Sequence, residues 1–193
     1  MNNLATILVQ TYPRKVKLED GTAITLRPLL KDDEQAFLAY FQSLAPEERV
    51  DLKEEVTDPK VIENWMETLD YDVMLPLVAL HENRIVGAAS LRFSLSAWTR
   101  HQGQVNLSTD PRYRAKGLGT LLIQNLEEVA VKVGLEQLTA EVPPELTKAF
   151  YLFEKLRFQK AAVLPGFVMD AAGHESDIVL MIKTLAPAGM AAA

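Results

Sequence analysis

Between a predicted strand and a predicted helix, the chain reads Asp110-Pro111-Arg112-Tyr113-Arg114-Ala115-Lys116-Gly117-Leu118-Gly119-Thr120. Two glycines one residue apart let a ligand approach the backbone closely, and the first N–H groups of a helix have no partners within it. The helix dipole adds partial positive charge at this end, and Arg112, Arg114 and Lys116 add three cations. The stretch therefore predicts a phosphate or pyrophosphate site, although its spacing alone also fits a tight turn with a solvated basic surface.

Two widespread phosphate-binding motifs do not fit this turn. A dinucleotide-binding turn needs a third glycine three residues after Gly119, where the chain has Leu122. A Walker loop needs Gly-Lys-Ser/Thr, whereas here Lys116 precedes Gly117. The sequence therefore indicates a phosphate site of another kind.

The segments around the turn predict a mixed α/β sheet with helices on both faces. Asp20-Gly21 marks a hairpin turn, and a strand, a helix and a strand follow one another between Gln104 and Val142. Strand patterns cover residues 22–28, 75–80, 85–93, 104–109, 138–142, 158–164 and 177–182, and helical patterns cover 32–44, 59–69, 117–133 and 143–156. Residues 1–13 show no strong periodicity. We therefore expect an N-terminal extension over residues 1–15, one domain over 16–185 and a disordered tail over 186–193.

The composition excludes several classes of site and partner. The 193 residues include no Cys and three widely separated His, so a thiolate metal centre and a cysteine nucleophile are excluded and no metal site is expected. The formal net charge of −6 argues against nucleic acid or an anionic membrane as a partner. Because the chain has neither a leader pattern nor a run of about 18 apolar residues, we expect a cytoplasmic protein.

The turn and its neighbours resemble the GNAT family of N-acetyltransferases. The acyl-CoA pyrophosphate loop of that family has the pattern Arg/Gln-x-x-Gly-x-Gly/Ala, which Arg114, Gly117 and Gly119 meet. The likeness continues downstream through the strand at 138–142 and the helix before Phe158, and upstream to the strand at 24–29. It covers residues 16–185, which is nearly the whole chain.

The resemblance implies the acyl-CoA N-acyltransferase fold, a mixed, mostly antiparallel sheet that splays open to hold acetyl-CoA. It implies that the backbone of residues 114–120 binds the pyrophosphate. It also implies that amides around residues 107–109 pair with the pantetheine and polarise the thioester carbonyl. The cofactor-binding residues implied in this way are Leu107, Thr109, Arg112, Arg114, Ala115, Lys116, Gly117, Leu118, Gly119 and Thr120.

The chain departs from the family pattern at the expected acid and base. Phe153 replaces the Tyr that often protonates the departing thiolate, and Tyr151 lies about 200° away around the helix. Gln104 stands where some members carry a catalytic carboxylate. A Leu and an Arg also replace an Asn and a Gly of the family pattern near this helix.

The remaining catalytic candidates are Glu141 and Tyr151. Alternation along the strand at 138–142 turns Glu141 to the other sheet face, at the place where the family's sheet opens, and a carboxylate there can accept a proton directly or through water. The alternative for Glu141 is a solvent-facing or helix-paired carboxylate, and the alternative for Tyr151 is a partly exposed side chain that packs on a neighbour. His101 and Glu82, which we expect in loops, are further alternatives for the base.

The hypothesis that follows is an enzyme that transfers the acetyl group of acetyl-CoA directly to a primary amine, because no Cys can carry it. A noncatalytic acyl-CoA-binding regulatory module is the alternative, suggested by Phe153 and Gln104, and a general phosphate-ligand domain is a third. A small amine, an antibiotic, a peptide N-terminus and a protein Lys all fit as acceptors, and the acidic composition slightly favours a cationic amine. A homodimer through an edge strand around residues 177–181 is also open.

Overall fold

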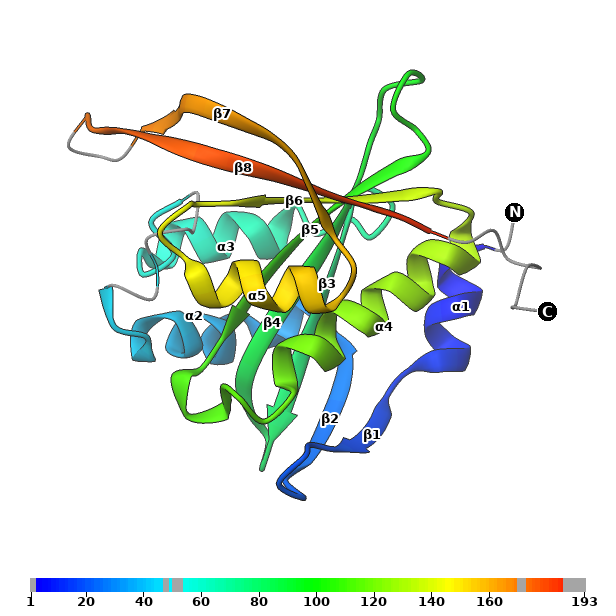
Figure 1. Ribbon diagram of the computed structural model, residues 1–193. Helices are drawn as coiled ribbons and strands as arrows, with labels where there is room; N and C mark the ends of the chain where they lie inside the picture. Colours follow the sequence, from blue (N-terminus) through cyan, green and yellow to red (C-terminus); the bar gives the residue numbers. More distant parts are fainter. Residues whose placement is uncertain (1–2, 47–48, 50–53, 170–172, 186–193) are drawn as a thin grey trace.

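An eight-stranded sheet forms the centre of the computed structural model, which describes residues 3–46, 49, 54–169 and 173–185 (Figure 1). The strand order is β1-β2-β3-β4-β5-β6-β8-β7. Every neighbouring pair is antiparallel except β5 and β6, which are parallel, so the predicted mixed, mostly antiparallel sheet is confirmed. The strands are β1 Arg14–Lys17, β2 Ala23–Pro28, β3 Met74–His81, β4 Arg84–Phe93, β5 Gln102–Thr109, β6 Gln137–Val142, β7 Gln159–Met169 and β8 Glu175–Thr184.

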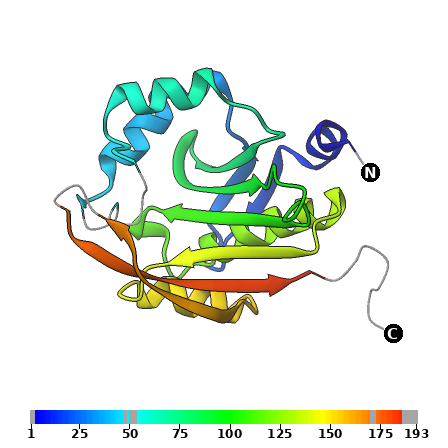
Figure 2. The ribbon, with the colours of Figure 1, turned by 90° about the horizontal axis from the view of Figure 1, so that it is seen from above.

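Helices cover both faces of this sheet, as predicted (Figures 1 and 2). One face carries α1 Leu4–Thr11, α4 Leu118–Val133 and α5 Thr147–Lys155, and the other carries α2 Glu34–Ser43 and α3 Pro59–Glu67. Fully buried Leu122, Leu126 and Leu138 belong to the larger core under α4. A smaller core joins Phe41 of α2 and Ile62 of α3 to the opposite face of β3 and β4.

Local signals explain where several elements begin and end. The side chain of Asp58 accepts a hydrogen bond from the N–H of Lys60 and so caps α3. Gly134, with a φ of 90°, ends α4 in the left-handed region. The turn at Asp20-Gly21 joins β1 and β2 as an antiparallel hairpin. The hairpin turn predicted at Asp20-Gly21 is confirmed.

The segment without periodicity contains a helix, α1, which the sequence pattern does not reveal. Ile7 and Leu8 of α1 are buried in the larger core. Just after this helix, the guanidinium of Arg14 bonds to Asn125 and Glu128 of α4 at 2.9–3.1 Å. Lys132 of α4 also donates to the hydroxyl of Thr11 at 3.4 Å, so α1 is held by contacts with a helix more than 100 residues away.

The C-terminal hairpin corrects one expectation. The segment around residues 177–181 belongs to β8, which pairs with β6 on one side and β7 on the other, so it is not an edge strand. The edge of the sheet is β7, because the chain crosses over from β6 through α5 and β7 before β8 returns between them. The tail expected at 186–193 lies outside the described residues.

Candidate active site

The predicted phosphate turn lies between β5 and α4. Asp110 accepts a hydrogen bond from the N–H of Arg112 and starts a short 3-10 helix, Pro111–Tyr113. The backbone then enters the left-handed region at Ala115, with a φ of 55°, and at Gly117, with a φ of 88°, before α4 begins at Leu118. A left-handed residue immediately before the helix favours glycine, which explains Gly117.

The backbone N–H groups of residues 115–120 meet no acceptor within the part of the chain that the structure describes. The first hydrogen bond of α4 runs from the N–H of Leu121 to the carbonyl of Gly117, at 2.9 Å. A row of uncommitted donors at the positive end of a sixteen-residue helix is a site for an anion.

The hairpin turn between β1 and β2 contacts this loop on its carbonyl side. The N–H of Glu19 donates to the carbonyl of Lys116 at 3.1 Å, and Nζ of Lys116 pairs with Asp20 at 2.9 Å. Hydrogen bonds from Thr22, together with Lys116, hold the pKa of Asp20 well below its ordinary value. The turn therefore fixes the carbonyl side of the loop and leaves the N–H side open.

The sheet opens beside the loop. β5 and β6 pair only between residues 102–104 and 137–139, although β5 continues to Thr109 and β6 to Val142. The N–H of Asp110 donates to the carbonyl of Val86, so even-numbered residues at this end of β5 bond to β4. The backbone groups of Leu107 and Thr109 therefore face the side from which β6 has departed.

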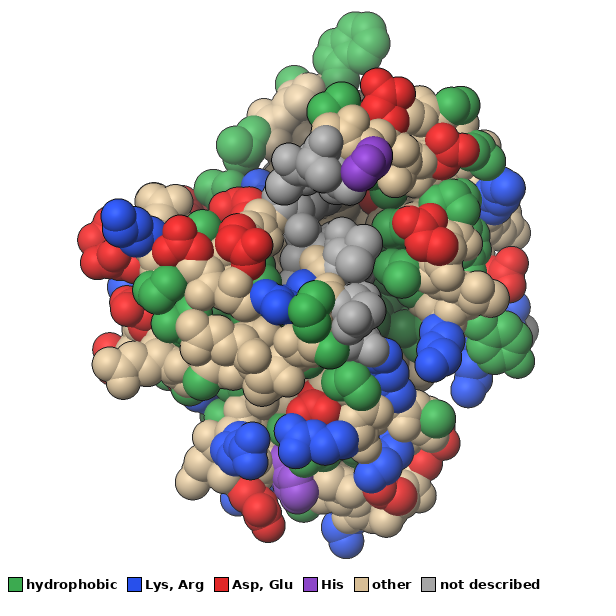
Figure 3. All heavy atoms as spheres, turned by 90° about the vertical axis from the view of Figure 1, so that its left-hand side faces the viewer, with side chains coloured by type: hydrophobic (Ala, Val, Ile, Leu, Met, Phe, Trp, Pro, Cys, Tyr) green, Lys and Arg blue, Asp and Glu red, His purple; other side chains and the backbone are tan. Residues whose placement is uncertain are grey.

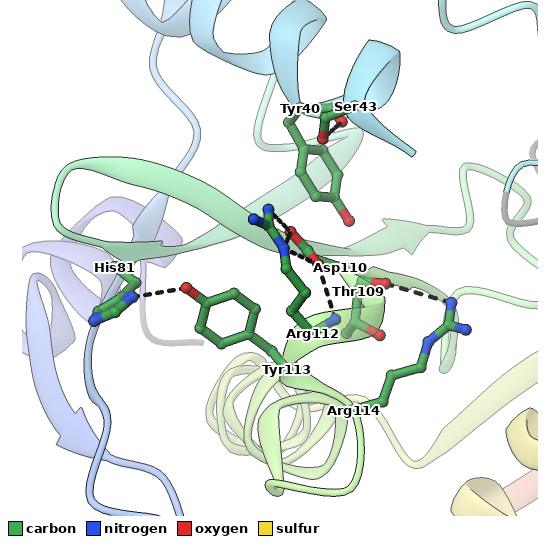
Figure 4. Close-up of polar contacts among 8 residues, drawn as sticks. All are labelled: Tyr40, Ser43, His81, Thr109, Asp110, Arg112, Tyr113 and Arg114. Atoms are coloured by element: carbon green, nitrogen blue, oxygen red, sulfur yellow. Dashed lines mark hydrogen bonds and ion pairs between the residues drawn. The ribbon is translucent and has the colours of Figure 1, made fainter. Parts of the chain in front are cut away.

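The three cations of the turn have different partners, and Figure 4 shows two of them, Arg112 and Arg114. The guanidinium of Arg112 donates hydrogen bonds of 2.5–3.1 Å to the carboxylate of Asp110, and this pairing holds the pKa of the Asp110 carboxyl below its usual value. Lys116 is paired with Asp20. Arg114 points away from Arg112, and its Nη2 lies 3.5 Å from the carbonyl of Thr109. Of the three side chains, Arg114 is thus the one that lies beside the opened edge of β5.

Basic residues also gather around this side of the molecule. Lys and Arg side chains cluster in the lower half of the face shown in Figure 3, which is the side where the β5–α4 turn lies in Figure 1. A local basic surface on a chain with a net charge of −6 is favourable for a polyanionic ligand.

Gly119 has a packing role in addition to the ligand approach expected from the sequence. A Cβ at this position would lie 3.1 Å from Leu107 of β5 and 3.2 Å from Leu152 of α5. Such contacts are too short for a side chain without movement of the neighbours. Gly119 therefore sets how closely the start of α4 approaches β5 and α5.

A hollow of about 270 Å³ lies where β5 and β6 begin to separate. Glu141 is half-buried and lines it, on the face predicted from strand alternation. Gln104 lines the same hollow. The full set of lining residues is Arg92, Phe93, Ser94, Thr99, Gln102, Gly103, Gln104, Thr139 and Glu141.

The other catalytic candidates lie elsewhere. Tyr151 is 72% exposed on α5 and does not line the hollow. Phe153 is buried and packs edge-on against Phe158, with ring centroids 5.0 Å apart. Glu82 forms part of the β3–β4 turn with a φ of 50°, and neither it nor His101 lines the hollow.

Two hydroxyl contacts near the turn were not expected from the sequence. The hydroxyl of Tyr40 on α2 lies 2.9 Å from that of Ser108 on β5, and Nδ1 of His81 lies 2.7 Å from the hydroxyl of Tyr113. The only signal for the first pair is a Tyr on the apolar face of a predicted helix, because a buried hydroxyl needs a partner. The sequence gives no signal for Arg92 either, because its place in the hollow depends on the pairing of β4 with β5.

Among the described residues, no three His, Asp or Glu side chains gather in a way that could hold a metal ion. In the same part of the chain, no helix is long and apolar enough to cross a membrane.

The model of the GNAT acetyltransferase family matches residues 33–158, a span that includes the turn, the opened edge of β5 and the hollow. The chain belongs to the GNAT family. This membership confirms the resemblance seen in the sequence and accounts for the splayed sheet.

Individual relatives are more distant. The [ribosomal protein bS18]-alanine N-acetyltransferase of Salmonella typhimurium is 30% identical over 77 residues, which are 40% of this chain and 52% of that protein. The match thus spans about half the length of this curated relative. The GNAT domain of S. lividans PAT is 17% identical, with a TM-score of 0.74 over 89% of this chain and 96% of the other. A Salmonella typhimurium acetyltransferase structure, yncA with its cofactor acetyl-CoA, is 20% identical, with a TM-score of 0.69 over 88% of this chain and 98% of the other.

Proposed function

We propose that this GNAT protein transfers the acetyl group of acetyl-CoA directly to a primary amine. The observation that carries the proposal is the row of uncommitted N–H groups at residues 115–120 beside the opened edge of β5. The turn offers donors for two phosphates, and the strand edge offers donors for an extended amide-containing arm. The pantetheine diphosphate part of CoA has two phosphates joined to an extended amide-containing arm, so it matches both sets of donors.

Each part of the donor has matching groups in this chain. The N–H groups of residues 115–120 would bind the pyrophosphate, and Arg114 adds a positive charge on the same side. The amides of Leu107 and Thr109 would pair with the pantetheine arm and donate to the thioester oxygen. Negative charge grows on that oxygen during attack, so a fixed N–H there lowers the barrier.

Glu141 is the group that we assign to proton removal. An ordinary primary ammonium has a pKa near 10.4, so it must lose a proton before its nitrogen can attack at neutral pH. Glu141 accepts this proton directly or through water, since its carboxylate lines the hollow on the acceptor side of the opening.

The bonds and protons of the transfer balance as follows. The nitrogen attacks the thioester carbon, the C–S bond breaks, and CoA leaves as a thiolate. The nitrogen loses its second proton after attack, and the thiolate gains one proton from water because the buried Phe153 offers none. The products are an amide, free CoA and one released proton.

Family membership favours turnover over the noncatalytic acyl-CoA-binding module. The relatives support the donor and the reaction class, since one is named for N-acetylation of an alanine and another was solved with acetyl-CoA. We further propose that the predicted domain at residues 16–185, together with α1 and the start of β1 that pack into it, acts as one acetyltransferase domain in the cytoplasm, with neither nucleic acid nor membrane as a partner. A homodimer would use the β7 edge rather than β8.

The test is release of free CoA from acetyl-CoA in the presence of a panel of primary amines, with acetylation of the amine confirmed by mass spectrometry. We expect amine-dependent release that Glu141→Gln slows by roughly 10²- to 10⁴-fold. Tight binding of acetyl-CoA with no release for any amine would support the noncatalytic module instead.

A further inference from the structure

The hollow beside the sheet opening contains two opposite charges on different strands. Arg92 comes from β4 and Glu141 from β6, and the two strands flank β5. Arg92 stands opposite Gln104, and Gln104 stands opposite Thr139, so the three residues form a row across the sheet. Glu141 lies two residues beyond Thr139 on the same face. The positive and negative groups therefore mark opposite sides of one hollow.

Arg92 is available for a ligand. Its side chain is exposed, and the one hydrogen bond that it makes in the described part of the chain is a weak contact of 3.8 Å between Nη2 and the sulfur of Met74. No carboxylate of the described residues lies within ion-pair distance of it. Arg112, in contrast, forms an ion pair with Asp110.

The rest of the hollow suits a small polar molecule. Hydroxyl and amide side chains supply part of its wall, namely Ser94, Thr99, Gln102, Gln104 and Thr139. Its volume of about 270 Å³ is close to the lower limit for small-molecule sites, which suits a ligand of amino-acid size. Several of these groups already bond within the chain, Ser94 to Thr99, Gln102 to Gln137 and Thr139 to the carbonyl of Gly103. The charges of Arg92 and Glu141 therefore distinguish one ligand from another more strongly than these groups do.

We propose that the acceptor is a primary amine that also carries a carboxylate, with the carboxylate on Arg92 and the amine beside Glu141. A guanidinium matches a carboxylate through two parallel hydrogen bonds, and the opposite charge of Glu141 orients the ammonium toward the opening. The inference rests on the proposed acetyl transfer and names its substrate class. This acceptor differs from the purely cationic amine that the acidic composition slightly favours. A carboxylate in the hollow is closer to Arg92 than to most of the other charges of the chain, so the attraction to Arg92 outweighs the effect of the net charge.

The experiment compares amino acids with their amides and their decarboxylated amines as acceptors, using acetyl-CoA and measuring CoA release. For the wild-type protein, we expect kcat/KM to be higher for the amino acid than for its two analogues by roughly 10- to 100-fold, as expected for hydrogen bonds between charged groups. Arg92→Gln should remove this preference by raising KM for the carboxylated acceptor alone, and Arg92→Lys should restore part of it. Arg100→Gln is the matched control, because Arg100 lies nearby on the loop that joins β4 to β5 but does not line the hollow.

The outcomes separate this inference from the proposed function. Turnover that is equal for amino acids and their amides, or a preference that survives Arg92→Gln, would overturn the acceptor class while leaving acetyl transfer intact. Failure to bind acetyl-CoA would overturn the proposed function itself. If acetyl-CoA binds but no amine is acetylated, ligand-observed NMR with the same amino acids and CoA shows whether the amino acid binds at Arg92. Binding that is lost in Arg92→Gln supports the inference, and absence of binding overturns it.

Discussion

Gln104 of β5 and Thr139 of β6 are the last paired residues before the two strands separate. Beyond this point lie the free edge of β5 and the start of α4, and the hollow lined by Gln104, Thr139 and Glu141 lies at the point itself. Because one strand borders both regions, a donor bound along its edge and an acceptor in the hollow would meet at the opening. The separation of β5 from β6 is thus the feature that joins the two halves of the site.

Substitution of Gly119 by Trp should abolish acetyl-CoA binding. A Cβ at this position would lie 3.1–3.2 Å from the side chains of Leu107 and Leu152, and an indole needs much more room, so it would displace these leucines or the start of α4. Titration calorimetry with acetyl-CoA measures the effect, and circular dichroism shows whether the variant is folded. A folded variant with the affinity of the wild type would contradict the assignment of the loop.

Arg114→Ala should weaken acetyl-CoA binding by roughly 3- to 30-fold, since the backbone donors of residues 115–120 remain. The loss should shrink as salt is added, because charge attraction is screened. Arg157→Ala is the matched control, because Arg157 lies beyond α5, at a separate hollow bordered by β7 and β8. Equal losses of affinity in the two variants would argue against a specific role for Arg114.

Glu141→Gln should lower kcat by roughly 10²- to 10⁴-fold and leave acetyl-CoA affinity unchanged, as expected when a general base is lost. Glu145→Gln, a change at an exposed position between β6 and α5, should leave both quantities unchanged. The comparison uses initial rates with a saturating acceptor. A kcat in Glu141→Gln within twofold of the wild type would show that another group removes the proton.

Asp110→Asn should lower the free energy of unfolding by about 1–3 kcal/mol at pH 7, because Asp110 is buried and bonded to Arg112. The folded-state pKa of Asp110 is below its ordinary value, so its contribution is present above the unfolded pKa near 3.9 and is lost as the pH falls through the folded pKa. The difference in urea stability between wild type and variant should therefore shrink below pH 4. Asp72→Asn, a change at an exposed residue, is the control and should leave stability nearly unchanged.

Local patterns predicted the parts of the fold and site that depend on nearby residues. The hairpin turn at Asp20-Gly21 and the alternation that places Glu141 in the hollow each follow from a few neighbouring positions. The burial of Phe153 likewise follows from helical spacing. Backbone geometry and periodicity determine these features.

Features that depend on distant contacts could not be predicted. α1 is held by α4, and the pairing of Lys116 with Asp20 requires the β1–β2 turn to lie against the loop. The position of Arg92 in the hollow follows from the register of β4 against β5. In each case, the deciding partner is separated in sequence from the residue that it positions.

Titration calorimetry with acetyl-CoA, free CoA and ATP tests the central claim most directly, namely that the β5–α4 turn and the opened strand edge bind an acyl-CoA. The account predicts micromolar binding of acetyl-CoA, weaker binding of free CoA and no comparable binding of ATP, because ATP lacks an arm for the β5 edge. Absence of acetyl-CoA binding, or equal affinity for ATP, would contradict it.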